Sequence, residues 1–350
     1  MTFTSFRRLL AAGVALAILS GAAPAFAAPP RSDEVAEPDL TVRAPNGLPI
    51  NKCVPESLRK HTISFRASDG VRVSGLAFGS GEKGVVLEHE QGWYICSWLP
   101  FAQILASRGY NVVLLEARGT GASAKVTEGQ LKHLDRDFLA AAHELTRRGA
   151  TTIVAGGASQ GGTAAINSAP KIPSLAGLIV FSSPRDSDPY TPEMDALESI
   201  KKVTKPSFFA VSPGDMGNAF VVEVKGLYEA SGATEKHYET VGGGIHGVGM
   251  MDSPEGGAAL REKLLAFIAD AFAKVGLTDS SDSPTTGAPD GTGAEAAAGT
   301  GTKVTAGTKV TTGGQASTSD ERPWTPIALT VGVAAMLLIG AVGLLRRRRS

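Results

Sequence analysis

Between about residues 51 and 276, short apolar runs alternate with longer stretches whose apolar residues recur at helical spacing. The apolar runs predict buried strands, and the residues around Asp69-Gly70 predict a hairpin that precedes them. Buried strands that alternate with helices are typical of a mostly parallel sheet covered on both faces. We therefore expect an α/β fold. The predicted strands are 62–66 and 71–78 in the hairpin, then 84–89, 111–116, 151–156, 177–181, 207–211 and 238–241; the predicted helices are 98–107, 131–148, 217–230 and one from Ser253, with Pro254 in its first turn.

The first 27 residues have the layout of a secretory signal peptide. Arg7 and Arg8 form a positive region, residues 9–19 are apolar, and Ala25-Phe26-Ala27 is a small-x-small cleavage site. This order of features is typical of export signals, and the apolar run is too short to span a bilayer well. We expect cleavage after Ala27.

The other end of the chain predicts a membrane anchor. Residues 327–345 are apolar apart from Thr330, and Arg346 to Arg349 follow directly. At ~1.5 Å per residue such a helix can cross the ~30 Å hydrocarbon core, and the arginines should stay on the cytoplasmic side. We predict a transmembrane helix over 323–345 and a cytoplasmic tail over 346–350. The arrangement resembles a Gram-positive-type surface protein, but no LPxTG motif precedes the helix, which favours a membrane anchor over covalent attachment to the wall.

The parts between these ends differ sharply in composition. Residues 277–322 are rich in Gly, Ser, Thr and Ala, and they predict a flexible tether with no core of its own. Residues 51–276 suit one folded domain, preceded by an N-terminal extension over 28–50. The formal net charge is zero, so nothing favours a nucleic-acid partner. Cys53 and Cys96 are the two cysteines, and in an exported chain we expect them to form a disulfide; two separate thiols are the alternative.

The stretch VAGGASQGG (154–162) combines a predicted strand, a turn and the start of a helix. Gly157-Ala158-Ser159-Gln160-Gly161 matches G-x-S-x-G in the strand–turn–helix position that this motif requires. Glycines permit a tight turn, and a serine at a helix N-terminus lies where backbone N–H groups favour developing negative charge. We predict that Ser159 is a catalytic nucleophile.

A serine nucleophile needs a base, and the base needs an acid to orient it. His246 lies in a glycine-rich loop after the last predicted strand, at the sheet edge where sites of open α/β sheets collect. Asp215 ends another predicted strand, and Asp186 and Asp188, after the preceding strand, are its rivals as the acid. We favour Asp215. The other histidines are His61 and His237 at predicted strand starts, His133 and His143 in a predicted helix, and His89 at the end of an early strand.

From about residue 61 to 275 the chain resembles the α/β-hydrolase superfamily of serine hydrolases, and in particular its esterases and lipases. The order Ser159, Asp215, His246 is that of the superfamily, and residues 85–123 are similar to its N-terminal half, including Arg118, Gly119 and Gly121 before Ser123. The resemblance implies a Ser-His-Asp triad and an oxyanion hole made by the backbone N–H groups of Gln91 and Gln160. No large cap domain is expected, since residues 182–206 have room for one helix, at about 192–203.

Glu90 departs from the superfamily pattern, which has glycine at this place. A carboxylate beside the oxyanion hole would repel an oxyanion unless it points away or is paired. Glu116 also replaces a usual aspartate, and we interpret it as structural.

The predicted function is a surface-anchored serine hydrolase acting on a small ester or other acylated substrate, most simply a carboxylic-ester hydrolase. A peptidase or an acyl transferase on the same fold is the alternative, and a non-catalytic binding module is a third reading that Glu90 favours. No metal or cofactor is expected, because H-E-x-x-H and paired C-x-x-C motifs are absent; Asp135-Arg136-Asp137 reads as a solvated helix face.

Overall fold

The computed structural model describes residues 34–185 and 194–276. At its centre is an eight-stranded sheet in the order β10-β9-β8-β7-β5-β6-β4-β3. Every pairing between two of the strands β5 to β10 is parallel. Strands β3 and β4 form an antiparallel hairpin, and β4 pairs antiparallel with β6. The predicted mostly parallel sheet and the opening hairpin are thus confirmed. The strands are β3 (Thr62–Arg66), β4 (Arg72–Phe78), β5 (Lys83–Glu88), β6 (Asn111–Glu116), β7 (Thr152–Ala158), β8 (Leu175–Phe181), β9 (Ser207–Val211) and β10 (Lys236–Thr240).

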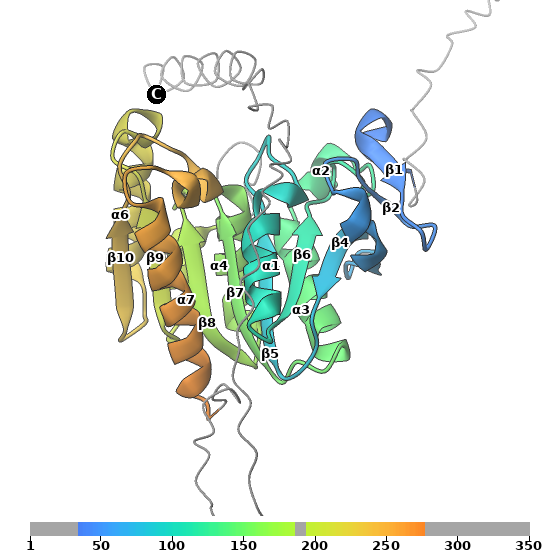
Figure 1. The fold of residues 1–350 in the computed structure, drawn as a ribbon. Helices are drawn as coiled ribbons and strands as arrows, with labels where there is room; N and C mark the ends of the chain where they lie inside the picture. The colour runs from blue at the N-terminus through green and yellow to red at the C-terminus, as the bar shows by residue number, and fades with distance from the viewer. Residues whose placement is uncertain (1–33, 186–193, 277–350) are drawn as a thin grey trace, which may run out of the picture.

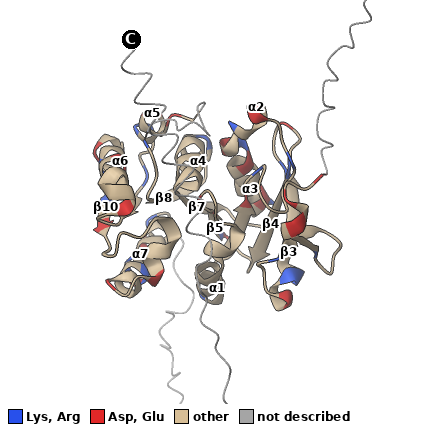
Figure 2. Cartoon of the chain, turned by 90° about the horizontal axis from the view of Figure 1, so that it is seen from above, with Lys and Arg blue, Asp and Glu red and all other residues tan. Residues whose placement is uncertain are grey.

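Helices cover both faces of this sheet (Figure 1). Helices α1 (Leu99–Ser107) and α7 (Gly257–Ala273) pack on one face, where their buried leucines and phenylalanines share a core with residues such as Val85 and Leu87 of β5. The other face is covered by α3 (Leu134–Arg147), α4 (Gln160–Ser168), α5 (Ala196–Ile200) and α6 (Ala219–Ala230). Seen from above, the sheet lies between these two layers, and acidic and basic residues are interspersed along the outer helices (Figure 2).

The central strands are buried on both sides, which explains their unbroken apolar runs. Every residue of β6 and of β8 is buried, and successive side chains of β5 enter opposite cores. The fold is therefore the predicted α/β fold. Of the described residues between β8 and β9, only Ala196–Ile200 form a helix, shorter than the expected 192–203, part of which lies outside the described residues.

Two helix starts differ from the sequence prediction. Helix α7 begins at Gly257 and not near Ser253, because Gly247–Asp252 form a 3₁₀ helix and Pro254 lies in the turn that follows. Helix α6 begins at Ala219, because the short 3₁₀ segment Asp215–Asn218 precedes it with left-handed backbone at Met216 (φ 45°), Gly217 and Asn218 (φ 73°). The Asn218 side-chain oxygen accepts the Gly214 N–H at 2.7 Å, a local bond that makes asparagine tolerant of this conformation. A short helix α2 (Glu128–Leu131) also precedes α3.

The described part of the N-terminal extension packs against the domain. Strands β1 (Thr41–Arg43) and β2 (Pro49–Asn51) form a two-stranded antiparallel sheet, and the Ala36 N–H donates to the Ser123 carbonyl at 2.8 Å. The predicted disulfide between Cys53 and Cys96 is present, which rules out two separate thiols. It joins the segment after β2 to the 3₁₀ turn Ile95–Ser97 before α1.

Several sequence predictions lie outside the described residues. These are the signal peptide (1–27), the tether (277–322), the transmembrane helix (323–345), the tail (346–350) and the rival acids Asp186 and Asp188. Within 34–185 and 194–276, no helix has the length and apolar character that a membrane crossing requires.

Candidate active site

The predicted nucleophile stands at a strained turn between a strand and a helix. Strand β7 ends at Ala158 and α4 begins at Gln160, so Ser159 alone makes the turn. Its backbone has φ 50° and ψ −121°, a conformation that residues other than glycine rarely adopt and that here is held by neighbouring hydrogen bonds. The Ser159 N–H donates to the Phe181 carbonyl at 2.8 Å, and the Ser159 carbonyl accepts the Thr163 N–H at 3.0 Å. This geometry is that of a nucleophile elbow.

Close backbone contacts explain the glycines that surround Ser159. A Cβ added to Gly157 would lie 2.4 Å from the Gly161 carbonyl carbon, and one added to Gly161 would lie 2.5 Å from the His89 carbonyl oxygen. A Cβ on Gly162 would overlap the Ser183 hydroxyl at 1.9 Å. Such contacts leave no room for a side chain. The stretch is bare because α4 packs directly on its own strand and on the end of β5.

His246 and Asp215 meet at the carboxyl edge of the sheet, the upper edge in Figure 1. Asp215 follows β9, His246 lies after β10, and the His246 Nδ1 is 2.9 and 3.0 Å from the two Asp215 carboxylate oxygens. A carboxylate only accepts, so Nδ1–H donates, and in the neutral ring the basic lone pair is then on Nε2. The Asp215 side chain is buried, whereas the His246 side chain is 22% exposed, so that its ring can be reached from solvent. The Phe220 ring of α6 packs edge-on to the imidazole, with centroids 4.5 Å apart.

Four of the five other described histidines have different surroundings. His61 ends a 3₁₀ helix and packs on Phe78, His133 precedes α3, His143 is exposed on α3, and His237 packs between Phe208 and Phe267 in β10. Ser159 follows β7, Asp215 follows β9 and His246 follows β10. All three residues thus lie at the carboxyl edge of the parallel strands, where the sequence predicted the site.

His89 fixes the peptide that carries one predicted oxyanion donor. It is fully buried; the Ala117 N–H donates to its Nε2 at 3.1 Å, so its Nδ1–H donates to the Glu90 carbonyl at 2.9 Å. Burial lowers the pKa of His89 to about 4, which keeps the ring neutral. Since the Glu90 carbonyl and the Gln91 N–H belong to one planar peptide, this bond orients the Gln91 N–H. Gln160 is the first residue of α4, where backbone N–H groups have no partner inside the helix.

The Glu90 carboxyl group is buried and hydrogen-bonded. The residue is 1% exposed, its Oε1 accepts the Val248 N–H at 3.2 Å, and its Oε2 is 3.5 Å from the Ser97 hydroxyl. Burial raises the pKa of this carboxyl, which favours its neutral form and weakens any repulsion of an oxyanion. The departure from glycine is therefore accommodated by the loop that carries His246.

The charged segment Asp135-Arg136-Asp137 is not the solvated helix face that its sequence predicted, because one of its residues is buried. Asp137 is fully buried, not part of a solvated helix face, and it forms an ion pair with Arg118, itself buried, at 2.7 Å. Arg118 also contacts Asp69 at 2.6 Å. Desolvation dominates at Asp137 and raises its pKa to about 6 despite the arginine. Glu116 is structural, as interpreted: it accepts from Asn51 and from the Ala122 N–H, and burial raises its pKa to about 7.

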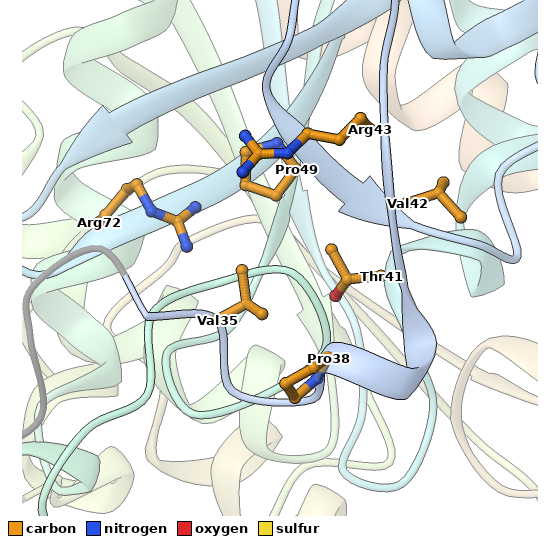
Figure 3. Close-up of a pocket in the computed structure, with 7 residues that line it drawn as sticks. All are labelled: Val35, Pro38, Thr41, Val42, Arg43, Pro49 and Arg72. Carbon is orange, nitrogen blue, oxygen red and sulfur yellow. The ribbon is translucent and has the colours of Figure 1, made fainter.

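A cavity of about 390 Å³ lies beside β1, β2 and β4 (Figure 3). Apolar side chains and the guanidinium groups of Arg43 and Arg72 line it, and none of the predicted site residues does so. Among the described residues, no group of three or more His, Cys, Asp or Glu side chains could hold a metal ion.

Comparisons with known proteins agree with this fold. Residues 80–214 match the model of the family described as serine aminopeptidase, S33, a range that contains the elbow and ends one residue before Asp215. The Pyrococcus furiosus esterase Pf2001 has a similar fold, with 18% identity, a TM-score of 0.51, and coverage of 67% of this chain and 99% of that one. The DcsB structure, solved with a substrate analogue, is similar at 14% identity and a TM-score of 0.52, covering 60% of this chain and 99% of that one. The comparison with curated proteins gives no match.

The eight-stranded sheet with its elbow defines an α/β-hydrolase fold. With the family match over residues 80–214 added, the chain is similar to serine hydrolases of this fold.

Proposed function

We propose that this protein is an extracytoplasmic carboxylic-ester hydrolase that acts through Ser159, His246 and Asp215. The observation that carries the proposal is the His246–Asp215 hydrogen bond at the sheet edge where the elbow presents Ser159. It leaves Nε2 of His246 as the free basic atom, which a serine nucleophile requires.

The reaction would proceed in two halves through an acyl-enzyme. The Ser159 hydroxyl attacks the ester carbonyl while Nε2 of His246 takes its proton, and the same proton then goes to the leaving alcohol. Water enters, gives a proton to His246 and attacks the acyl-serine. His246 then returns that proton to the Ser159 oxygen as the bond to the acyl group breaks, which releases the carboxylic acid and restores the serine. Asp215 holds the imidazole with Nδ1 protonated and stabilises the imidazolium that forms in each half.

The backbone N–H groups of Gln160 and Gln91 would stabilise the negative oxygen of each tetrahedral intermediate. The start of α4 adds the positive end of its helix dipole to the same point. Each preorganised donor of this kind contributes roughly 10²–10³ in rate. The hydrogen bond from His89 to the Glu90 carbonyl supports this role, because a donor is effective only when its orientation is set beforehand.

The purified full-length chain tests the proposal with short-chain nitrophenyl esters and a fluorophosphonate probe. We expect hydrolysis by the wild type, covalent labelling at Ser159, and a loss of roughly 10⁴-fold or more in kcat/KM in Ser159→Ala. Ser168→Ala is a matched control, because this buried serine of the same helix donates to the Asp135 carbonyl and lies at the far end of α4. Unchanged hydrolysis in Ser159→Ala, or labelling at another residue, would contradict the proposal.

A peptidase is the second candidate, since the matching family is described as serine aminopeptidase. Aminoacyl nitroanilides assayed beside the esters separate the two, because both substrate classes would use the same serine. Faster turnover of the anilides would favour the peptidase, and transfer of the acyl group to an added acceptor in place of water would indicate a transferase.

The location outside the cytoplasm rests on the two ends of the sequence alone. Cleavage after Ala27 gives a mature chain that begins at Ala28, which N-terminal sequencing of the exported protein would detect. Recovery of the protein with the membrane fraction, and its loss to the medium on truncation before residue 323, would support the anchor.

A further inference from the structure

The loop that carries His246 is held by side chains from the ends of three different strands. The Ile245 N–H donates to the Ser212 hydroxyl at 3.1 Å, and the Gly247 N–H donates to the Ser182 hydroxyl at 3.2 Å. The Val248 N–H donates to Oε1 of Glu90 at 3.2 Å. Ser212 follows β9, Ser182 follows β8 and Glu90 follows β5, so the loop on either side of the imidazole is fastened to the sheet.

Glu90 is the acidic member of these three anchors, and its carboxyl group lies directly against the histidine loop. A Cβ added to Gly247 would be 2.9 Å from Oε1 of Glu90, so the residue after His246 packs on the carboxylate with no space between them. Gly247 also has φ +60°, which brings the next N–H round towards Glu90. A glycine at position 90 could make none of these contacts.

The anchored N–H groups belong to residues 245, 247 and 248, next to His246 in the chain. The position of the His246 imidazole therefore depends on these three hydrogen bonds. The triad needs Nε2 of His246 within hydrogen-bond reach of Ser159, and displacement of a catalytic group by about 1 Å costs up to about 10²-fold in rate. Asp215 fixes the ring at Nδ1 from one side. The anchor at Val248, two residues beyond His246, limits rotation of the loop about that bond.

We propose that Glu90 is a positioning residue for His246, whose carboxylate oxygen accepts the Val248 N–H and thereby holds the histidine loop in the orientation that the triad requires. This inference rests on the proposed function of His246 as the catalytic base. The action of Glu90 is as a hydrogen-bond acceptor, so an amide oxygen at the same place should serve in its stead.

Kinetics of Glu90→Ala and Glu90→Gln in the full-length chain test the inference. In Glu90→Ala the Val248 N–H loses its acceptor, and we expect kcat to fall roughly 10- to 100-fold with KM within about twofold of wild type. In Glu90→Gln the amide oxygen still accepts from Val248 while its NH₂ faces the Ser97 hydroxyl, and we expect kcat to recover to within a few-fold of wild type. Glu116→Ala is the matched control: it removes another buried carboxylate that accepts a backbone N–H, and it should lower stability without this kcat effect.

Proton NMR gives a readout that does not depend on turnover. The Nδ1–H of His246 in its bond to Asp215 should give a far-downfield resonance, assigned by its loss in His246→Ala. We expect this signal to persist in Glu90→Gln and to broaden or vanish in Glu90→Ala, whose fold is checked by circular dichroism.

The outcomes separate this inference from the proposed function. If Ser159→Ala and His246→Ala are inactive while Glu90→Ala keeps both its kcat and the downfield signal, the positioning role is wrong and the triad stands. Equal losses in Glu90→Ala and Glu90→Gln, or a rise in KM at constant kcat, would also overturn it. If Ser159→Ala keeps wild-type activity, the proposed function fails, and the NMR signal alone then decides whether Glu90 orders the loop.

Discussion

Nδ1 of His246 lies 2.9 Å from one carboxylate oxygen of Asp215 and 3.0 Å from the other, although 31 residues separate them in the chain. The bond fixes the tautomer of the imidazole, since the proton must be on Nδ1 for a carboxylate to accept it. Because the Asp215 side chain is buried, its carboxylate is shielded from solvent.

The first prediction is that Asp215→Asn lowers kcat by roughly 10⁴-fold with little change in fold. An amide can donate to Nδ1, which moves the ring proton to Nε2 and removes the base that Ser159 needs. Steady-state kinetics on the preferred ester, with thermal unfolding as the check on stability, measures this. Asp252→Asn changes an aspartate whose side chain is 87% exposed and should behave as wild type. Activity in Asp215→Asn within tenfold of wild type would contradict the assigned acid.

The second prediction concerns the glycine contacts at the elbow. Gly161→Ala would place a Cβ 2.5 Å from the His89 carbonyl oxygen and 2.6 Å from that of Glu88, both of them backbone atoms that cannot swing away. Forcing α4 off the end of β5 should cost about 1–3 kcal/mol in the free energy of unfolding and displace Ser159. We expect a lower melting temperature and slow labelling by the fluorophosphonate probe.

Gly129→Ala is the comparison for that variant. Gly129 lies in α2, and a Cβ there would meet nothing within 4 Å. Alanine is the better helix former, so this variant should gain up to about 1 kcal/mol. If both variants lose stability equally, close packing at Gly161 is not the cause.

The fold and the place of the nucleophile follow from short-range patterns in the sequence. The apolar runs of β5 to β9 indicate strands that are buried on both faces of the sheet. The nine residues 154–162 contain G-x-S-x-G between a strand and a helix, which locates the elbow. Local patterns of this kind are readable because each residue's neighbours in sequence are also its neighbours in space.

What the sequence did not predict depends on contacts between distant segments. The residues next to Asp137 in the sequence are those of an exposed helix face. Asp137 reaches Arg118 only because α3 packs on the end of β6. The sequence does not show the roles of Ser182 and Ser212 for the same reason: each accepts a hydrogen bond from a loop more than 30 residues away. The serine that follows the apolar run of β8 and the one that follows β9 were the available signal, since polar residues at strand ends collect at the site edge.

The third prediction is that loss of the disulfide destabilises the protein without abolishing its fold. Cys53 and Cys96 enclose a sequence separation of 43 residues, and the entropy of closing such a loop corresponds to about 4 kcal/mol. We expect Cys53→Ser and Cys96→Ser to lower the free energy of unfolding by up to that amount. The double variant should be no less stable than either single one, because one bond is lost in all three. Denaturant unfolding under non-reducing conditions measures it, and wild type assayed with reductant should match the variants.

The fourth prediction concerns stability at acid pH and His89. Its pKa is about 4 in the folded protein against an ordinary 6.5, because burial disfavours the charged ring. Between these values the unfolded chain binds a proton that the folded chain does not. The stability that neutral His89 contributes is therefore fully present above pH 6.5 and is lost as the pH falls towards 4. The loss attributable to this residue is on the order of 3 kcal/mol.

His89→Gln tests this linkage, because an amide does not titrate in that range. The variant should be less stable than wild type at pH 8, where it lacks the bonds to Ala117 and Glu90, yet its free energy of unfolding should fall less steeply between pH 6.5 and 4. His143→Gln replaces an exposed histidine of α3 and controls for the loss of an imidazole as such. Denaturant unfolding at half-unit pH intervals gives the three slopes. Parallel curves for wild type and His89→Gln would show that the ring is not held neutral, and they would remove the argument that His89 orients the Gln91 N–H through a proton on Nδ1.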